Sequence, residues 1–116
     1  MIVDRRHTFD YKDYPNCFLV WDRYKMGGGI ALHIHDVEGP IATATVNIPE
    51  YRLKHNEVCI KNWSENEGCL EELERLGFVE RTGVTVPTGY VQSPVVKLLV
   101  DPPFDDLPEQ PEQQEA

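Results

Sequence analysis

The segment 30–48 carries the clearest pattern in the chain and constrains the fold more than any other feature. Apolar and other residues alternate along it with a period of two, break at 36–40, and then alternate again. Successive side chains of a β-strand point to opposite faces of a sheet, so this period predicts strand rather than helix. Every second residue of 30–34 should face one way, and Ala42 and Ala44 should continue that face. We therefore predict a β-hairpin with one buried and one wetter face.

A second β-prone run, 17–24, precedes the hairpin and is apolar on both faces, which is typical of a strand inside a sheet. Three glycines, 27–29, join the two and give the backbone the positive φ angles that a turn needs. A phosphate-binding loop is the alternative, but no P-loop signature follows and the next predicted element is a strand, not a helix. The other predictions are a short edge strand at 1–3, irregular structure at 4–15, and strands at 57–61, 82–86 and 90–99.

One helix is predicted to run from Ser64 to Gly77. Ser64 is placed to cap its start, Glu67 to complete a capping box, and Gly77 to end it in a left-handed conformation. Glu71 and Arg75 have the spacing of an ion pair on its wet side. Apolar residues at three- and four-residue spacing should pack on the apolar face of the hairpin: Cys69, Leu70, Leu73 and Leu76.

Length and composition indicate one globular domain, because the chain has 116 residues of which 41% are hydrophobic. No run approaches the roughly 20 apolar residues of a membrane span. The first residues lack the apolar core of a secretory signal, so we expect no membrane association and a cytoplasmic location. The three cysteines form no CxxC motif and are expected to be free thiols that pack as small hydrophobic residues.

The net charge of −9 is distributed unevenly. The segment 101–116 has no Lys or Arg and holds six carboxylates: Asp101, Asp105, Asp106, Glu109, Glu112 and Glu115. It is also rich in Pro and Gln and almost free of apolar residues. We therefore predict a folded domain over 1–100 and a disordered acidic tail over 101–116. The acidic balance disfavours direct binding to nucleic-acid phosphates.

Two histidines, His33 and His35, lie two apart on the wetter side of the hairpin and suggest a divalent-metal site, with Asp36 or Cys17 as a third ligand. The alternative is two surface histidines without a metal, because no third ligand has a characteristic spacing. A cysteine nucleophile is a weaker hypothesis, since any chain with several Cys and His residues offers such a pair. Its candidate thiols are Cys17 and Cys59, and its candidate bases are His33, His35 and His55. No catalytic residue, metal ligand or cofactor is assigned, and an enzymatic role is disfavoured.

Candidate partner-contact residues are of two kinds. Thr43, Thr45 and Asn47 form a polar ladder on one face of the hairpin, although Thr is also favoured in strands for packing reasons alone. The aromatic candidates are Tyr11, Tyr14, Trp63 and Tyr90, because aromatic side chains are enriched at interfaces. A further hypothesis is a nucleic-acid mimic whose helix carboxylates imitate phosphates: Glu65, Glu67, Glu71 and Glu74.

A set of turn and strand signatures points to a family. They are the run 42–49, 66–68, Leu76-Gly77, Thr82-Gly83, Gly89-Tyr90 and 94–98. In this order they resemble a family of small uncharacterised proteins, classed only as a domain of unknown function, which occurs in plasmids, integrative elements and phages. The resemblance covers roughly residues 17–99. It implies an accessory protein of a mobile genetic element, without established enzymatic activity and without catalytic residues to carry over.

These observations predict an α+β fold, with a mostly antiparallel sheet of about five or six strands and one helix packed on a face. The expected function is a non-enzymatic interaction protein of a mobile genetic element, in the cytoplasm of a bacterial host. Its partner would be a host or element protein, and inhibition of a bacterial defence system, of the anti-CRISPR or anti-restriction type, is one form of this. The alternatives are a small metal-binding domain or enzyme using His33 and His35, and the nucleic-acid mimic. The oligomeric state stays open.

Overall fold

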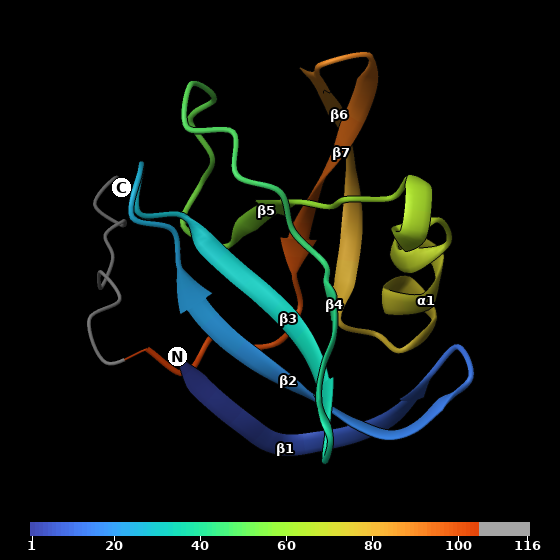
Figure 1. Cartoon of the computed structure of the whole chain (residues 1–116). Helices are drawn as coiled ribbons and strands as arrows, with labels where there is room; N and C mark the ends of the chain where they lie inside the picture. Colours follow the sequence, from blue (N-terminus) through green and yellow to red (C-terminus); the bar gives the residue numbers. More distant parts are fainter. Residues whose placement is uncertain (105–116) are drawn as a thin grey trace.

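The computed structural model of the chain describes residues 1–104 and confirms the predicted α+β class (Figure 1). Its seven strands, slightly more than predicted, form two antiparallel sheets. The four-stranded sheet has the order β1 (Ile2–Tyr11), β2 (Tyr14–Arg23), β3 (Ile30–Asp36) and β4 (Gly39–Thr43). The three-stranded sheet has the order β5 (Glu57–Cys59), β7 (Val91–Leu98) and β6 (Val79–Thr88). A 3-10 turn, η1 (Ser64–Asn66), and one helix, α1 (Cys69–Arg75), connect β5 to β6.

The predicted hairpin is β3 and β4, and its buried face is the predicted one. Ile34 pairs with Ala42 and His33 with Thr43, with a bulge after Ile34. The second half differs, because β4 ends at Thr43 and the chain crosses to the other sheet. There Thr45 bridges to Ile60. Ala44 packs in the large core, and Val46 and Ile48 pack against the smaller cluster, so this side of the chain stays apolar beyond the end of β4.

The first fifteen residues correct the prediction of irregular structure. Residues 2–11 form the ten-residue strand β1, which pairs along β2, and β2 itself already begins at Tyr14. Register shifts on both sides of Phe9 break the period of two that would have revealed a strand. Asp4 adds to the effect, since a carboxylate occupies an inward position and is 4% exposed. An inward charge and two irregularities together give the sequence of a strand the appearance of a loop.

The helix is shorter than predicted and begins elsewhere. Gly68, in the left-handed conformation with φ of 89°, separates η1 from α1 and is the N-cap of α1. Ser64 itself has a φ of 56° and makes no capping box. The amide of Leu70 instead donates to Oδ1 of Asn62 at 2.9 Å. The predicted end is confirmed, because Gly77 has a φ of 80°.

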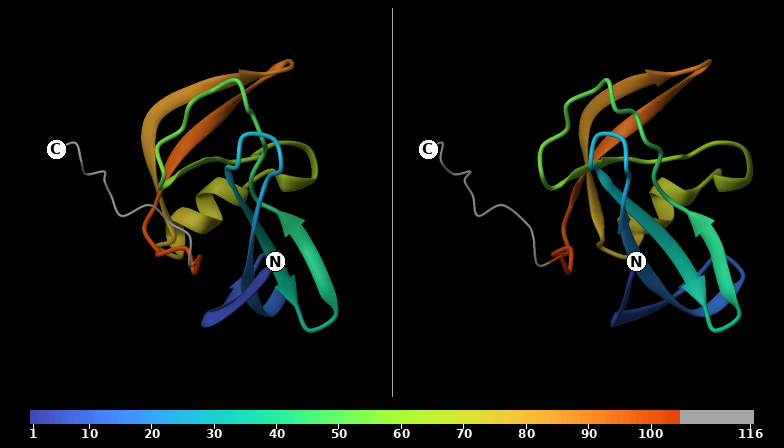
Figure 2. Two further views of the ribbon diagram at one scale, coloured as in Figure 1. Left: turned by 90° about the vertical axis from the view of Figure 1, so that its left-hand side faces the viewer. Right: turned by 60° about the vertical axis from the view of Figure 1, so that its left-hand side comes forward.

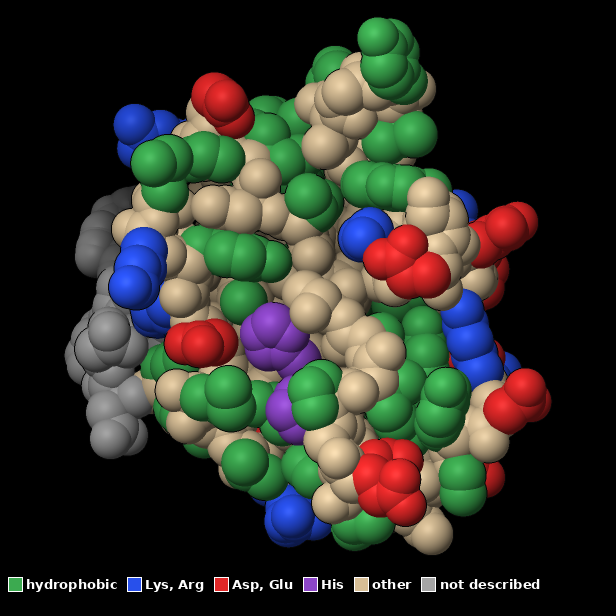
Figure 3. Space-filling view, in the orientation of Figure 1, with side chains coloured by type: hydrophobic (Ala, Val, Ile, Leu, Met, Phe, Trp, Pro, Cys, Tyr) green, Lys and Arg blue, Asp and Glu red, His purple; other side chains and the backbone are tan. Residues whose placement is uncertain are grey.

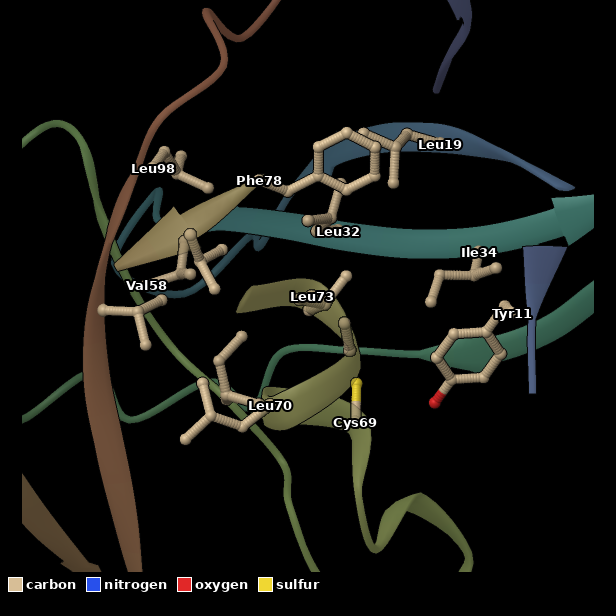
Figure 4. Packing of buried hydrophobic residues seen from close by; sticks show 14 of the residues in the cluster. Tyr11, Leu19, Leu32, Ile34, Val58, Cys69, Leu70, Leu73, Phe78 and Leu98 are labelled. Carbon is tan, nitrogen blue, oxygen red and sulfur yellow. The ribbon is translucent and has the colours of Figure 1, made fainter. Parts of the chain in front are cut away.

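A single large core lies between the two sheets and α1 (Figure 2). Leu70 and Leu73 of α1 pack in it with Leu32 and Ile34 of β3, which confirms that the helix meets the apolar face of the hairpin (Figure 4). A smaller cluster lies under the three-stranded sheet. It consists of Cys59, Val86 and Val95, with Val46, Ile48 and Leu53 packed against them.

The described chain ends against β1 and β2. The carbonyl of Asp101 accepts a hydrogen bond from Nη2 of Arg6 at 2.6 Å. The ring of Phe104 lies edge-on to Trp21, with 6.4 Å between ring centres. Four residues of the predicted tail are thus placed on the domain, and its remainder, 105–116, lies outside the described residues. Within residues 1–104 no helix has the length and apolar character to cross a membrane.

Candidate functional site

The hairpin of β6 and β7 extends beyond the rest of the domain, and we call its outer part, residues 84–93, the arm (Figures 1 and 2). Within the arm the pairing runs from Val86 with Ser93 to Thr88 with Val91, and Thr85 pairs with Pro94 at its base. The turn between them is Gly89-Tyr90, where Gly89 has a φ of 62°. Tyr90 is the most exposed large hydrophobic residue among the described residues, with a relative exposure of 107%. The fold therefore presents a whole aromatic ring to solvent at the end of a strand pair.

Hydroxyl groups and apolar packing hold the arm in place. The hydroxyls of Thr88 and Ser93 lie 2.6 Å apart and share a hydrogen bond across the strands, and Ser93 is fully buried. The hydroxyl of Thr85 donates to Oε1 of Gln92 at 3.1 Å. On its inner side, Val86 packs in the smaller core cluster. Cross-strand contacts therefore anchor the arm. Within residues 1–104 the structure shows no hydrogen bond or ring contact for the Tyr90 side chain at its tip.

A second exposed apolar group lies at the base of the arm. Val84 is 44% exposed and lies within the register shift between Arg81 and Thr85. A bulge of this kind re-aims side chains and bends a strand. Exposed apolar groups that occur singly are ordinary on a protein surface. An aromatic ring and a branched aliphatic residue on one projecting hairpin are the composition of an interface anchor.

The other predicted contact residues do not gather around the arm. Tyr14 is half exposed, but it lies at the opposite side of the domain, at the start of β2 (Figure 1). Thr43 is exposed at the end of β4, and Trp63 is partly buried. Asn47 donates through Nδ2 to the carbonyl of Met26 at 3.1 Å, so it connects two loops.

Two of the predicted contact residues are buried. Tyr11 is 2% exposed and packs in the large core. Thr45 is 3% exposed, and its hydroxyl oxygen accepts from the amide of Leu32 at 3.1 Å and shares a bond with Tyr24 at 2.9 Å. Both residues therefore serve the fold rather than an exposed contact surface. Their burial follows from strand register, which the sequence alone did not specify.

The histidine pair lies on the outer face of the four-stranded sheet, where histidines appear at the centre of the view in Figure 3. The rings of His33 and His35 are 6.3 Å apart, and Nδ1 of His33 lies 2.9 Å from the hydroxyl of Thr43. Burial, followed by the neighbouring His35, lowers the pKa of His33. The suggested third ligand Cys17 faces the core instead, on the opposite side of the sheet.

The other suggested ligand is engaged in a turn, because Oδ1 of Asp36 accepts from the amide of Glu38 at 2.9 Å. Across residues 1–104 no three His, Cys, Asp or Glu side chains are grouped so that they could hold a metal ion. The metal hypothesis therefore has only the two imidazoles in its favour.

All three thiols are buried, with exposures of 1% or less for Cys17, Cys59 and Cys69. Burial raises the pKa of each thiol, and that of Cys59 to about 11. The thiolate is the nucleophilic form of cysteine, so little of it exists in these positions at neutral pH. This geometry gives no support to a cysteine nucleophile.

The helix carboxylates are paired with basic side chains rather than arrayed alone. Arg81 of β6 contacts Glu74 at 2.8 Å and Glu71 at 3.1 Å, so the predicted pair of Glu71 with Arg75 is replaced. Arg75 pairs instead with a carboxylate three residues before it, Glu72, at 2.8 Å, and that hydrogen bond lowers the pKa of Glu72. Such pairing reduces the negative potential that imitation of a phosphate backbone requires.

No known protein-family model, curated protein or solved structure matches the chain. The resemblance to the family of unknown function therefore stays a prediction.

Proposed function

We propose that this domain is a non-enzymatic protein-interaction module that binds its partner through the arm. The observation that carries the proposal is the complete exposure of Tyr90 at the tip of a hairpin whose base is fixed by hydrogen bonds and packing. Tyrosine combines a large apolar ring with a polar hydroxyl and loses little side-chain entropy on binding, so it is a frequent interface anchor. A partner with a concave apolar pocket would bury the ring.

The state of the chemically reactive side chains supports binding over catalysis. The thiols are buried with raised pKa values, and Asp4, Glu71, Glu72 and Glu74 have arginine partners. A general acid or base needs a pKa near the working pH and access to substrate. Carboxylates paired with arginine remain ionised at neutral pH and act as structural links.

The biological setting that we propose comes from the resemblance noted in the sequence. On that basis the module belongs to a mobile genetic element and acts in the cytoplasm of a bacterial host. Its partner is a host or element protein, and in the most specific form it inhibits a bacterial defence system, as anti-CRISPR or anti-restriction proteins do. The arm gives such an inhibitor a protruding aromatic group to insert into its target.

The experiment is affinity capture from bacterial lysate with the wild-type chain and the Tyr90→Ala variant as baits. We expect the wild-type chain to retain a specific protein, and Tyr90→Ala to lose about tenfold or more in affinity for it, as for a central aromatic anchor. Tyr14→Ala is the matched control, because Tyr14 is exposed at another turn. Equal retention by wild-type and Tyr90→Ala chains, or no specific retention by the wild-type chain, would refute the proposal.

The defence-inhibitor form has its own test. Cells that carry a CRISPR or restriction system are challenged with phage while they express the wild-type chain or Tyr90→Ala. A rise in phage plating with the wild-type chain but not with the variant is expected. If phage plating is unchanged for every system tested, the role as a defence inhibitor is contradicted, while the proposal of an interaction module is unaffected.

A further inference from the structure

A cavity of about 490 Å³ lies between the loop that joins β2 to β3 and the loop 47–57, at the upper left of the domain in Figure 1. Its volume is within the range of sites for small-molecule ligands. The loops approach closely at one point, because a Cβ built on Gly27 would lie 3.4 Å from Cβ of Pro49. The hydrogen bond from Asn47 to the carbonyl of Met26 joins them a second time. Two connected loops therefore form the walls, and none of the described residues that line the cavity belongs to the arm.

One wall is the glycine turn 27–29, which contributes backbone groups without side chains. Arg23 supports this wall, since its Nη1 donates to the carbonyl of Gly28 at 2.9 Å and its guanidinium lies 4.5 Å from the centre of the Phe104 ring. Within residues 1–104, nothing accepts a hydrogen bond from the backbone amide of Gly27 or Gly28. Unengaged backbone N–H groups of a turn are donors for an anion. The turn predicted from the sequence thus also provides donors at the cavity wall.

The opposite wall presents two exposed cations, Arg52 and Lys54. Neither side chain makes an ion pair with any residue in the range 1–104. The amide of Lys54 donates to Oε1 of Glu57 at 3.0 Å, and the amide of Glu57 donates to the carbonyl of Lys54 at 3.1 Å. These two hydrogen bonds hold the loop that carries the cations. An arginine and a lysine together suit a phosphate group, because the guanidinium binds two oxygens at once and the ammonium adds a point charge.

The remainder of the lining suits a planar ring. Ile30 is 5% exposed, and Ile48 and Leu53 are half-buried, so apolar side chains line the cavity beside the charged ones. Tyr51 lines the same cavity and is 37% exposed, so its ring is accessible to a ligand. Nucleobases of every kind stack on aromatic side chains, because each base has a π-face. An inorganic anion would leave this part of the cavity unused.

A second carboxylate, Glu50, also lines the cavity and is exposed. It would repel a simple anion, but it accepts hydrogen bonds in the way that carboxylates bind the ribose hydroxyl of nucleotides. Glu57 is less available for this purpose, because its Oε1 already accepts the amide hydrogen of Lys54. The lining therefore combines donors for a phosphate, an acceptor for a hydroxyl group and an aromatic ring for a base.

We propose that this cavity is a binding site for a ribonucleoside monophosphate. The phosphate binds Arg52, Lys54 and the glycine turn 27–29. The base lies against Tyr51 and the apolar lining, and the ribose donates to Glu50. Because the ligand contacts both loops, its binding joins them more firmly and should raise the melting temperature of the domain. The acidic balance of the chain disfavours a long phosphate backbone, whereas a mononucleotide carries a single phosphate group.

Isothermal titration calorimetry of the full-length chain with AMP tests this proposal. We expect saturable binding at one site per chain. Adenosine and inorganic phosphate should each bind at least about tenfold more weakly than AMP, because each lacks one of the two groups that the cavity recognises. Added salt should weaken the binding of AMP, since the cations are exposed and their charge is screened.

Substitutions in the lining should weaken binding in a specific way. Arg52→Ser with Lys54→Ser should lower the affinity for AMP about three- to tenfold and leave that for adenosine unchanged. Tyr51→Ala should lower the affinity for AMP about fivefold or more through the loss of stacking. Lys97→Ser and Tyr14→Ala are the matched controls, because both residues are exposed and do not line the cavity. All these side chains are exposed, and unchanged circular dichroism verifies the fold.

The contact with the ribose has its own readout. 2′-Deoxy-AMP should bind the wild-type chain about threefold or more weakly than AMP, because it lacks the hydroxyl group that donates to Glu50. Glu50→Gln should remove most of this difference. Equal affinities of the wild-type chain for the two nucleotides would contradict the assignment of a ribonucleotide.

Four other outcomes would overturn the proposal. The first is the absence of saturable AMP binding at millimolar concentration, and the second is AMP binding that survives the Arg52 and Lys54 substitutions. The third is adenosine binding as tight as that of AMP, which excludes recognition of the phosphate. The fourth is an equal affinity for inorganic phosphate, which reduces the cavity to a site for a simple anion. Tyr90→Ala should bind AMP as the wild-type chain does, so failure of this proposal is distinguishable from failure of binding through the arm.

Discussion

The indole Nε1 of Trp21 donates a hydrogen bond of 2.9 Å to Oδ2 of Asp4, and both side chains are buried. Arg6 completes the arrangement, because its Nε and Nη2 donate to the same carboxylate at 2.9 and 2.8 Å. One ionised carboxylate thus satisfies the indole of the core tryptophan and links β1 to β2. The same Arg6 holds the carbonyl of Asp101, so the group also places the end of the described chain.

Asp4→Ala should lower the free energy of unfolding by about 3 kcal/mol, because it leaves the buried Trp21 N–H without an acceptor and Arg6 without its partner. Urea denaturation monitored by tryptophan fluorescence measures this change. Asp13→Ala is the control, since Asp13 is exposed and its substitution should change stability by less than about 0.5 kcal/mol. Similar losses for the two variants would show that the buried group is not a stabilising link.

Stability should depend on pH through the same carboxylate. The hydrogen bond from Arg6 is the largest cause that lowers the pKa of Asp4 in the folded chain. A lowered folded-state pKa means that the unfolded chain binds the proton more readily. The contribution is therefore fully present above the unfolded-state pKa of about 4, and it is lost as the pH falls below that value. The stability difference between wild-type and Asp4→Asn chains should shrink from pH 5 towards pH 2, and a constant difference would contradict this.

Gly68 allows a prediction about the helix start. Its φ of 89° is unfavourable for residues with a Cβ, while the space around a Cβ there is open. Gly68→Ala should therefore destabilise the domain by about 1–2 kcal/mol through backbone strain alone. Gly29→Ala is the matched control, because Gly29 also has open space but no positive φ. Thermal unfolding of the two variants compares them, and equal melting temperatures would remove the strain argument.

The parts of the fold that were predicted from sequence are those set by local pattern. The alternation at 30–34 predicts the buried face of β3, because a sheet with one buried face requires that period. The start of α1 was missed because its N-cap is Gly68, and the amide of Leu70 in the first turn donates to Asn62, eight residues earlier, rather than to Ser64. The strand β1 was missed because bulges beside Phe9 interrupt the period.

The candidate sites were less accessible to sequence reasoning, for a physical reason. Tyr11 and Tyr90 both lie next to predicted turns or loops, yet one is in the core and the other is fully exposed. Strand register and the projection of a hairpin determine whether such a tyrosine is buried or exposed, and both depend on tertiary structure. One surface cavity is lined by Arg23 from the loop region after β2 and by Arg52 and Lys54 from the loop 47–57. These residues are about thirty positions apart in the sequence, so only the approach of the two loops brings them together.

Burial of the three thiols predicts slow reaction with a thiol reagent in the folded state. Since burial raises the pKa of Cys59 to about 11, its thiolate fraction near neutral pH is very small. We expect Ellman's reagent to modify Cys17, Cys59 and Cys69 rapidly only after urea unfolding. One thiol per chain that reacts rapidly in the native protein would contradict the buried arrangement and would revive the hypothesis of a cysteine nucleophile.

Substitutions at two neighbouring positions of the arm, Ser93 and Tyr90, should have different effects on the stability of the domain. Ser93 is fully buried and shares a hydrogen bond with Thr88, so Ser93→Ala should lower the free energy of unfolding by about 1 kcal/mol. Tyr90 is fully exposed, so Tyr90→Ala should change it by less than about 0.5 kcal/mol. Urea denaturation of both variants measures the two values. A large loss of stability in Tyr90→Ala would mean that the ring packs on the domain, and its loss of partner binding would then reflect a damaged fold rather than a missing contact.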